Sequence, residues 1–239
     1  MEYYSHSNNK ILIAHFPGQT KHENLELINE LKEREFILPN NIDIVSVITK
    51  DCLKTSSLNY QLKKNNYTYI NSVKDRIMSW SRCGKIYHVL DSLKESSKEY
   101  SLILDGNDVV ILSDLTDLVS LFESYNKKII FNSTIWMYPH VIVDNVHNRG
   151  QYGEYCYLNA GCAFGKTEDL IQFYELAIKE LEKDSNHKKV DSEQYYIRKV
   201  FDKHQDIVFF DYECKLFQCW HKAEYEYKES NEKKICILR

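Results

Sequence analysis

The stretch YSLILDGNDVVIL, which runs from Tyr100 to Leu112, decides the fold class. Its first half is a compact, largely apolar run, which is typical of a strand that is covered on both faces. The run ends at Asp105-Gly106-Asn107-Asp108, so two carboxylates emerge at the carboxyl end of the strand. In α/β sheets, ligands bind beyond this end of the strands. The stretch therefore predicts an α/β fold and indicates where its site lies.

Strands and helices are predicted to alternate along the rest of the chain. Apolar and β-branched runs predict further strands at residues 10–16, 42–48, 128–131 and 207–210. Apolar residues at helical spacing predict helices at residues 24–34, 86–93, 115–122, 170–181 and 195–201. Residues 51–71 are polar and irregular, and we interpret them as a surface segment over the site. This alternation predicts a Rossmann-like, mostly parallel sheet with helices on both faces.

Size and composition favour one domain. The 239 residues are 43% hydrophobic, which is enough for one sizeable core. Only 7 Gly and 3 Pro are present, which leaves little material for a flexible linker. We therefore expect a single domain over residues 1–239, in which residues 1–9 are disordered.

Charge and hydropathy exclude several classes of protein. The net charge of −4 and the lack of a Lys/Arg-rich run argue against a nucleic-acid partner. The polar start, Met1 to Lys10, lacks the apolar stretch that is typical of a signal peptide, and no window reaches the roughly 18 apolar residues of a membrane span. The seven cysteines are odd in number and scattered, as is usual for reduced thiols. We expect a cytoplasmic protein, and the sequence leaves its oligomeric state open.

The acidic pair after the strand has two interpretations. Mg²⁺ and Mn²⁺ prefer oxygen ligands and often share a few carboxylates with substrate phosphates. Asp105 and Asp108 can supply such a pair, and Gly106 would let the backbone approach a diphosphate. The alternative is that the two aspartates only form an Asx-type turn, since Asp is common in turns.

Six segments lie in a characteristic order around this pair. They are Gly84-Lys85-Ile86 at the start of a helix, LILDGNDVVIL, FNSTIWMYP (131–139), YLNAGCAFG (157–165), DSEQYYIRKVF (191–201) and DYECKLFQ (211–218). This order resembles the glycosyltransferase domain of the procollagen lysyl hydroxylase/glycosyltransferase family and related GT-A sugar transferases. The resemblance covers roughly Gly84 to Gln218, and upstream of Gly84 it extends only to the placement of strands.

The resemblance implies a GT-A-like fold and a metal-dependent hexosyltransferase. Its donor would be a UDP-sugar, UDP-glucose or UDP-galactose, and its cofactor Mn²⁺ or Mg²⁺. The acceptor would be a hydroxyl of a protein or glycan, such as hydroxylysine of a collagen-like chain. A rival interpretation is a non-catalytic module that binds the nucleotide sugar without turnover.

Several residues acquire roles from the resemblance. Asp105 and Asp108 form a DxxD motif that would hold the metal and the donor's diphosphate, and Lys85 would contact the phosphates unless it is a solvated helix-start lysine. Tyr138 takes the place of a family tryptophan and would line the acceptor entrance, with buried packing as the alternative.

The remaining site candidates lie in the two later segments. Asn159 and Gly161 would sit where the backbone passes close to the donor sugar or acceptor, and Gln194 keeps its place in the donor site. Asp191 and Glu193 match an acidic cluster near the transferred sugar, so they are the catalytic candidates, although the family's run of aspartates is reduced here to Asp-Ser-Glu. The alternative is that this cluster caps a helix and favours its first turn.

One family segment has no counterpart in the chain. In the family, His-Gly-Asn-Gly downstream of the Phe-Gln pair supplies a further metal ligand. Either this chain lacks a C-terminal metal-ligand segment or another residue completes the site, and His221 is the nearest histidine downstream. Two carboxylates alone would bind Mn²⁺ weakly until the diphosphate added its oxygens. Cys214, Cys219 and His221 have a spacing atypical of zinc sites, and we interpret the two cysteines as packing residues.

Overall fold

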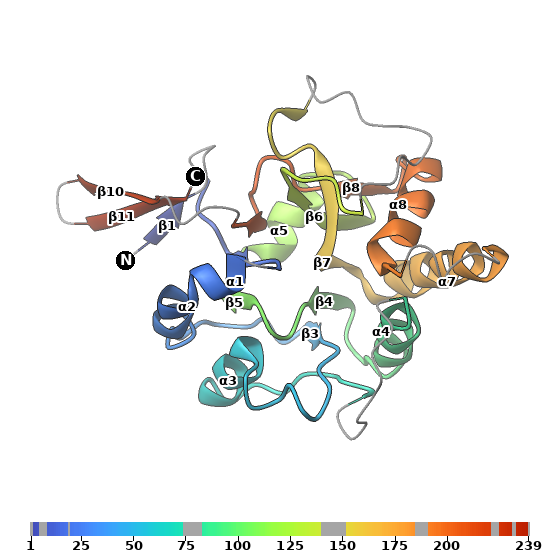
Figure 1. Cartoon of the computed structure of the whole chain (residues 1–239), viewed down its shortest axis with the longest axis horizontal. Helices are drawn as coiled ribbons and strands as arrows, with labels where there is room; N and C mark the ends of the chain where they lie inside the picture. Colours follow the sequence, from blue (N-terminus) through green and yellow to red (C-terminus); the bar gives the residue numbers. More distant parts are fainter. Residues whose placement is uncertain are drawn as a thin grey trace.

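The structure is a computed structural model, and it describes residues 2–4, 9–18, 20–73, 83–139, 152–184, 191–220, 225–230 and 233–238. It has the predicted α/β class, with strands grouped into three sheets among these residues (Figure 1). None of the helices in the described part of the chain combines the length and apolarity that crossing a membrane requires.

The central sheet is mixed, so the prediction of a mostly parallel sheet is wrong. Its strands, in spatial order, are β3 (Ile42–Val45), β4 (Tyr100–Leu104), β7 (Tyr157–Lys166), β6 (Ile129–Thr134) and β8 (Val208–Phe210). The pairs β3–β4 and β6–β8 are parallel, whereas β7 lies between β4 and β6 and is antiparallel to both. The sequence pattern did not identify β7 as a strand. Nine consecutive residues of β7 are buried, so it shows no alternation that would mark a strand.

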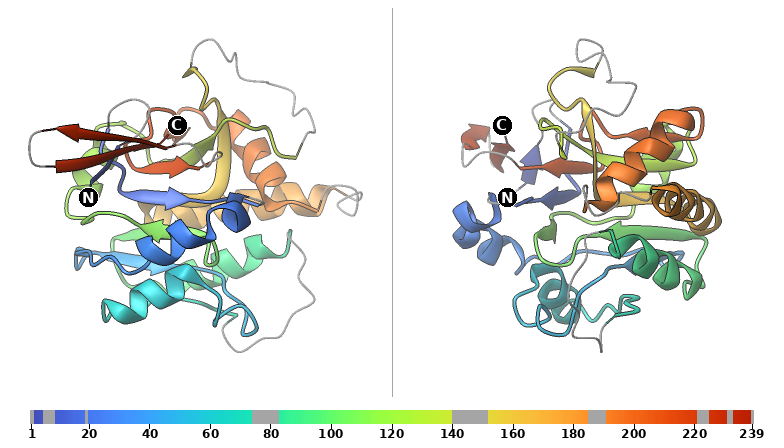
Figure 2. Two further views of the ribbon diagram at one scale, coloured as in Figure 1. Left: turned by 60° about the vertical axis from the view of Figure 1, so that its left-hand side comes forward. Right: turned by 45° about the vertical axis from the view of Figure 1, so that its right-hand side comes forward.

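Helices cover both faces of this sheet. On one face lie α4 (Lys85–Lys94), α7 (Thr167–Lys183) and α8 (Glu193–Lys203), which stack side by side in Figure 2. Their apolar stripes pack on Ile103 and the other side chains of that face, whereas the neighbouring Leu102 and Leu104 point into a second core. The second core includes α3 (Ser57–Lys64) and α5 (Leu118–Glu123). Alternation along each buried strand thus divides one sheet between two cores.

The helix α3 corrects the interpretation of residues 51–71 as irregular. Leu58 and Leu62, four residues apart, are fully buried on one side of α3. The helix begins after Ser56, whose hydroxyl accepts a hydrogen bond from the backbone N–H of Asn59 at 2.9 Å, as an N-cap does. The residues just before α3 do line the site described below.

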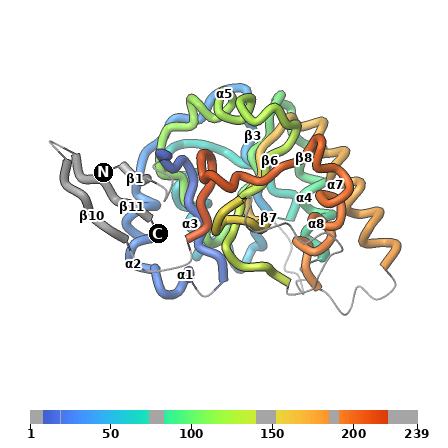
Figure 3. The backbone as a smooth tube through the Cα atoms, turned by 90° about the horizontal axis from the view of Figure 1, so that it is seen from above, coloured from blue at the N-terminus to red at the C-terminus, as the bar shows by residue number. Residues whose placement is uncertain are grey.

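A second sheet joins the beginning, middle and end of the chain. It consists of β5 (Val109–Ile111), β2 (Ile13–His15) and β9 (Phe217–Cys219), with β2 antiparallel to β5 and parallel to β9. The short helices α1 (Thr20–Glu23) and α2 (Leu25–Leu31) follow β2, and α2 packs on this sheet through Ile28 and Leu31. Figure 3, viewed from above, shows early (blue) and late (red) parts of the chain close together, as the pairing of β2 with β9 requires.

The third sheet consists of β1 (Glu2–Tyr4), β11 (Lys233–Leu238) and β10 (Tyr225–Ser230). The strand β1 therefore lies inside the stretch of residues 1–9 for which we expected disorder. It pairs in parallel with β11, so its backbone partners come from the other end of the chain. A pairing over this separation leaves no local signal in the sequence.

Candidate functional site

A cavity of about 790 Å³ opens where the carboxyl ends of β2 and β4 meet the starts of α4 and α8. Eight predicted site residues line it: Lys85, Asp105, Asp108, Tyr138, Asn159, Gly161, Glu193 and Gln194. Asp191 is the one predicted site residue that does not. The structure thus brings together residues from five of the six segments that carry the family resemblance, as well as residues from β2 and the loop after β3.

The acidic loop between β4 and β5 is held from three sides. The backbone N–H of Asp105 donates to the carbonyl of Gly161, and that of Phe16 donates to the carbonyl of Asp108, both at 2.8 Å. The hydroxyl of Ser56 donates to the carbonyl of Gly106. A Cβ on Gly106 would lie 2.1 Å from a side-chain carbon of the buried Ile48. Packing against Ile48 is therefore enough to explain the glycine at residue 106, whether or not a ligand binds.

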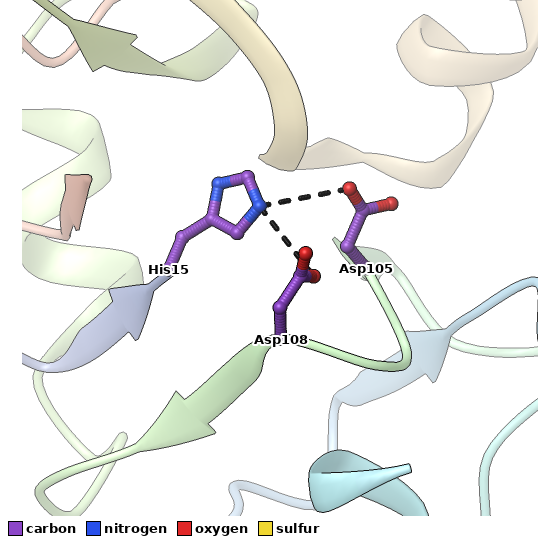
Figure 4. A group of neighbouring side chains, drawn as sticks. All are labelled: His15, Asp105 and Asp108. Carbon is purple, nitrogen blue, oxygen red and sulfur yellow. Dashed lines mark ion pairs between the residues drawn. The ribbon is translucent and has the colours of Figure 1, made fainter. Parts of the chain in front are cut away.

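His15 completes a three-residue cluster with the acidic pair. Its Nε2 lies 3.7 Å from Oδ2 of Asp105 and 3.6 Å from Oδ1 of Asp108 (Figure 4). One ligand atom from each residue lies within 4.8 Å of the others, so the three could hold a metal ion. His15 was not among the predicted site residues, because its only signal in the sequence is a histidine near the end of the apolar run KILIAHF.

The charges of His15 and Asp108 stabilise each other. Burial alone would lower the pKa of His15, but Cys219 and Asp108 raise it well above its usual value. Burial would likewise raise the pKa of Asp108, but its hydrogen bond and charge interaction with His15 lower it. In the absence of a cation, a protonated His15 therefore neutralises part of the acidic cluster.

Lys85 lies inside the site. Its ammonium contacts Oδ1 of Asp105 and lies 3.3 Å from Oε1 of Glu193, and its side chain is largely buried. Burial would lower the pKa of Lys85, but the two carboxylates raise it above its usual value. The interpretation of Lys85 as a solvated lysine is therefore wrong. The ion pairs link the start of α4, the loop after β4 and the start of α8.

The two catalytic candidates differ in position. The carboxylate of Glu193 lines the cavity next to Lys85. The carboxylate of Asp191 instead accepts a hydrogen bond from the backbone N–H of Cys83 at 3.0 Å, and together with burial it raises the pKa of Cys83 to about 12. The N-cap of α8 is Ser192, so Asp191 does not cap this helix either. Of the two described side chains, Glu193 is the one that lines the cavity.

Three other predicted residues organise the backbone of the cavity wall. Gln194 accepts from the N–H of Ala160 at 3.0 Å and donates to the carbonyl of Tyr138 at 2.6 Å. Asn159 accepts from the N–H of Gly161 at 2.8 Å. A Cβ on Gly161 would lie 2.2 Å from the imidazole carbon Cε1 of the buried His15. Glycine at 161 therefore makes room for the His15 ring.

Two exposed aromatic residues form part of the cavity wall. Tyr138 is 45% exposed and Trp136 is 60% exposed, and both line the cavity. The alternative of buried packing for Tyr138 is therefore wrong. Trp136 stands in the FNSTIWMYP segment, but sequence analysis did not single it out. The other candidate metal ligand, His221, lies outside the residues that the structure describes.

We expect the metal-free protein to lose stability as the pH rises above about 6.5, the usual pKa of an unfolded histidine. A raised folded-state pKa for His15 contributes stability that is complete below the unfolded pKa of about 6.5 and is lost as the pH passes the folded-state value. Urea unfolding at several pH values, with a chelator present, measures this loss. His15→Gln should remove this contribution, and an equally steep decline in that variant would contradict the assignment.

Comparison with known proteins identifies the family of the chain. A family model described as the PLOD GT domain matches residues 81–238, whereas a search of curated proteins finds no match. The matched stretch contains Lys85, the acidic pair and Glu193, but it begins after His15. It covers well over half of the chain and includes all six segments on which the resemblance rests. The chain therefore belongs to the glycosyltransferase domains of the procollagen lysyl hydroxylase/glycosyltransferase family.

Proposed function

We propose that this chain transfers a hexose, glucose or galactose, from a UDP-sugar to a hydroxyl group of a protein or glycan, with Mn²⁺ or Mg²⁺ as cofactor. Hydroxylysine of a collagen-like protein is the acceptor that the family favours. The observation that carries the proposal is the cluster of His15, Asp105 and Asp108 in one cavity with Lys85 and Glu193.

The charge balance of the cavity supports a divalent cation. Among the described residues, the partly buried carboxylates of Asp105, Asp108 and Glu193 outnumber the ammonium of Lys85, which pairs with two of them, and the exposed Asp51 also lines the cavity. The cluster is therefore negatively charged when His15 is neutral. Carboxylates suit Mg²⁺ and Mn²⁺, and an imidazole ligand favours a first-row transition ion over Mg²⁺. A bound cation would neutralise the charge that develops on the leaving UDP. The three ligand groups belong to β2 and to the two ends of one tight loop.

The remaining cavity residues suit contacts with the donor and with the acceptor. Lys85 is a buried cation beside the acidic pair, so it can bind a phosphate oxygen of the diphosphate. Glu193, which Lys85 holds in the cavity, is the carboxylate best placed to deprotonate the acceptor hydroxyl or to stabilise the oxocarbenium-like sugar. The exposed rings of Trp136 and Tyr138 offer apolar faces on which an acceptor can pack.

The rival function is a non-catalytic module that binds a UDP-sugar. Both functions predict that a UDP-sugar with Mn²⁺ raises the melting temperature of the protein. Only the enzyme releases UDP, so a coupled assay of UDP release with UDP-glucose and UDP-galactose, with and without a hydroxylysine peptide, separates the two. Affinity without UDP release would favour the binding module.

We expect His15→Ala and Asp108→Asn to weaken Mn²⁺ binding in the absence of nucleotide, because each removes one of three candidate protein ligands. Calorimetric titration of Mn²⁺ measures this effect, and UDP should strengthen binding in the wild-type protein, because the two ligands share the site. His22→Ala, which changes a histidine outside the cluster, is the control. Wild-type Mn²⁺ affinity in both site variants would refute this metal site.

We expect Glu193→Gln to lower UDP release by about 100-fold or more, as the loss of an acid–base group does, with little change in melting temperature. Asp191→Asn is the matched control, because its carboxylate contacts the Cys83 N–H and does not line the cavity. It should keep turnover within about threefold, since the amide oxygen still accepts that hydrogen bond. The opposite order of effects would assign the catalytic carboxylate to Asp191.

A further inference from the structure

A buried cysteine lies directly behind the candidate metal ligand His15. Strands β2 and β9 pair in parallel so that His15 and Cys219 are register partners. Nδ1 of His15 lies 3.5 Å from Sγ of Cys219, whereas Nε2, on the other side of the ring, faces Asp105 and Asp108. Both His15 and Cys219 are buried. The imidazole therefore bridges the acidic cluster on one side and a single sulfur atom on the other.

The amide of Asn132 lies beside both Nδ1 of His15 and Sγ of Cys219. Its Nδ2 donates to Sγ of Cys219 at 3.2 Å, while its Oδ1 accepts from the backbone N–H of Ser133 at 2.7 Å. The amide nitrogen also lies 3.5 Å from Nδ1 of His15, which is long for a hydrogen bond between two nitrogen atoms. Sulfur is larger, so the same 3.5 Å is a suitable separation for a hydrogen bond from Nδ1 to Sγ. Cys219 is thus the acceptor at the centre of this small network.

We propose that Cys219 is a positioning residue, which accepts a hydrogen bond from Nδ1–H of His15 and so keeps the lone pair of Nε2 directed at the metal site. This inference rests on the proposed function, because it assigns the metal to His15. A histidine that ligates a metal generally donates its second ring N–H to a fixed acceptor, which sets both the tautomer and the ring orientation. Carboxylates and carbonyl groups are the usual acceptors, and here a thiol sulfur takes their place.

The contact also links the stretch that the family model matches to a strand that precedes it. His15 lies before the stretch that the family model matches, and Cys219 lies within it, directly after the Phe-Gln pair. The β2–β9 pairing brings the two together, and the small surface of Gly161 leaves room for the ring between them and the acidic loop. The orientation of His15 therefore depends on contacts at both of its ring nitrogens.

Calorimetric titration of Mn²⁺ tests the proposal. Cys219→Ala should weaken Mn²⁺ binding about 10- to 100-fold, as the loss of such a partner does in other metal sites, and Cys219→Ser, which keeps an acceptor, should recover part of it. Cys214→Ala is the matched control, since it removes a buried thiol from the same small core without contact to His15. Wild-type affinity in a folded Cys219→Ala, or equal losses in the two alanine variants, would overturn the proposal.

A second measurement does not depend on the metal. Nitrogen-15 NMR of the His15 ring in metal-free protein, at a pH alkaline enough for a neutral ring, reports which nitrogen carries the proton. Without a metal, the carboxylates of Asp105 and Asp108 favour a proton on Nε2, so the test is the change in the tautomer population when the thiol is removed. We expect Cys219→Ala to lower the share of the Nδ1 proton relative to the wild-type protein, and Cys214→Ala to leave it unchanged. An unchanged population in Cys219→Ala would refute the role of Cys219. If Cys219→Ala shifts the population but the wild-type protein binds no Mn²⁺, the hydrogen bond stands and the proposed metal site fails.

Discussion

The pairing of β2 with β5 and β9 is the constraint on which the site depends. The register places His15 opposite Val109 on one side and opposite Cys219 on the other. Val109 directly follows Asp108, so the same register brings the acidic loop beside the imidazole. Backbone hydrogen bonds extend the pairing past the strand ends, since Trp220 N–H donates to the carbonyl of His15 at 2.7 Å. A slip of one residue would turn His15 to the opposite face and separate it from both partners.

The edge of this small sheet is itself held by a buried carboxylate. Asp211 is fully buried and accepts from the Tyr125 hydroxyl and from the backbone N–H groups of Lys215, Leu216 and Phe217. Burial raises the pKa of Asp211, while these donors oppose the rise. Since an unpaired buried carboxylate is costly, the donors must stay in place, and they order the turn that leads into β9. The ordered backbone of the segment DYECKLFQ therefore positions the next residue, Cys219, behind His15.

The charged side chains of the cavity form one connected network of ion pairs. Under the proposed function, a metal ion and a diphosphate would replace some of these pairs. Lys85 pairs with Asp105 and Glu193, and His15 with Asp105 and Asp108. A cation at the acidic pair competes with the proton of His15 and with the ammonium of Lys85 for the same oxygens. An incoming diphosphate gives that ammonium an alternative anionic partner. Under the proposed function, the site is thus organised before ligands arrive, and His15 and Lys85 pair with the carboxylates to which the metal would bind.

The sequence by itself determined the features that neighbouring residues encode. The apolar run Tyr100–Leu104 followed by two aspartates predicted β4 and the place of the site, and helical spacing predicted the core of α4, which begins at Lys85. The order of short segments indicated the family, because this order can be read from the sequence without knowing which strands pair. These features depend on local periodicity and on the chemistry of residues a few positions apart.

Only the tertiary structure decided the strand directions, the third candidate ligand and the relation between the acidic residues near α8. The fully buried β7 carries no alternation, so its antiparallel place between β4 and β6 was not readable from its residues. His15 reaches the acidic pair, about ninety residues away in sequence, through the register of β2 and β5 alone. Asp191 and Glu193 are two residues apart, yet only Glu193 reaches the cavity, because the chain enters α8 between them. Such outcomes follow from pairing and packing between distant segments, and no short window of sequence contains both partners.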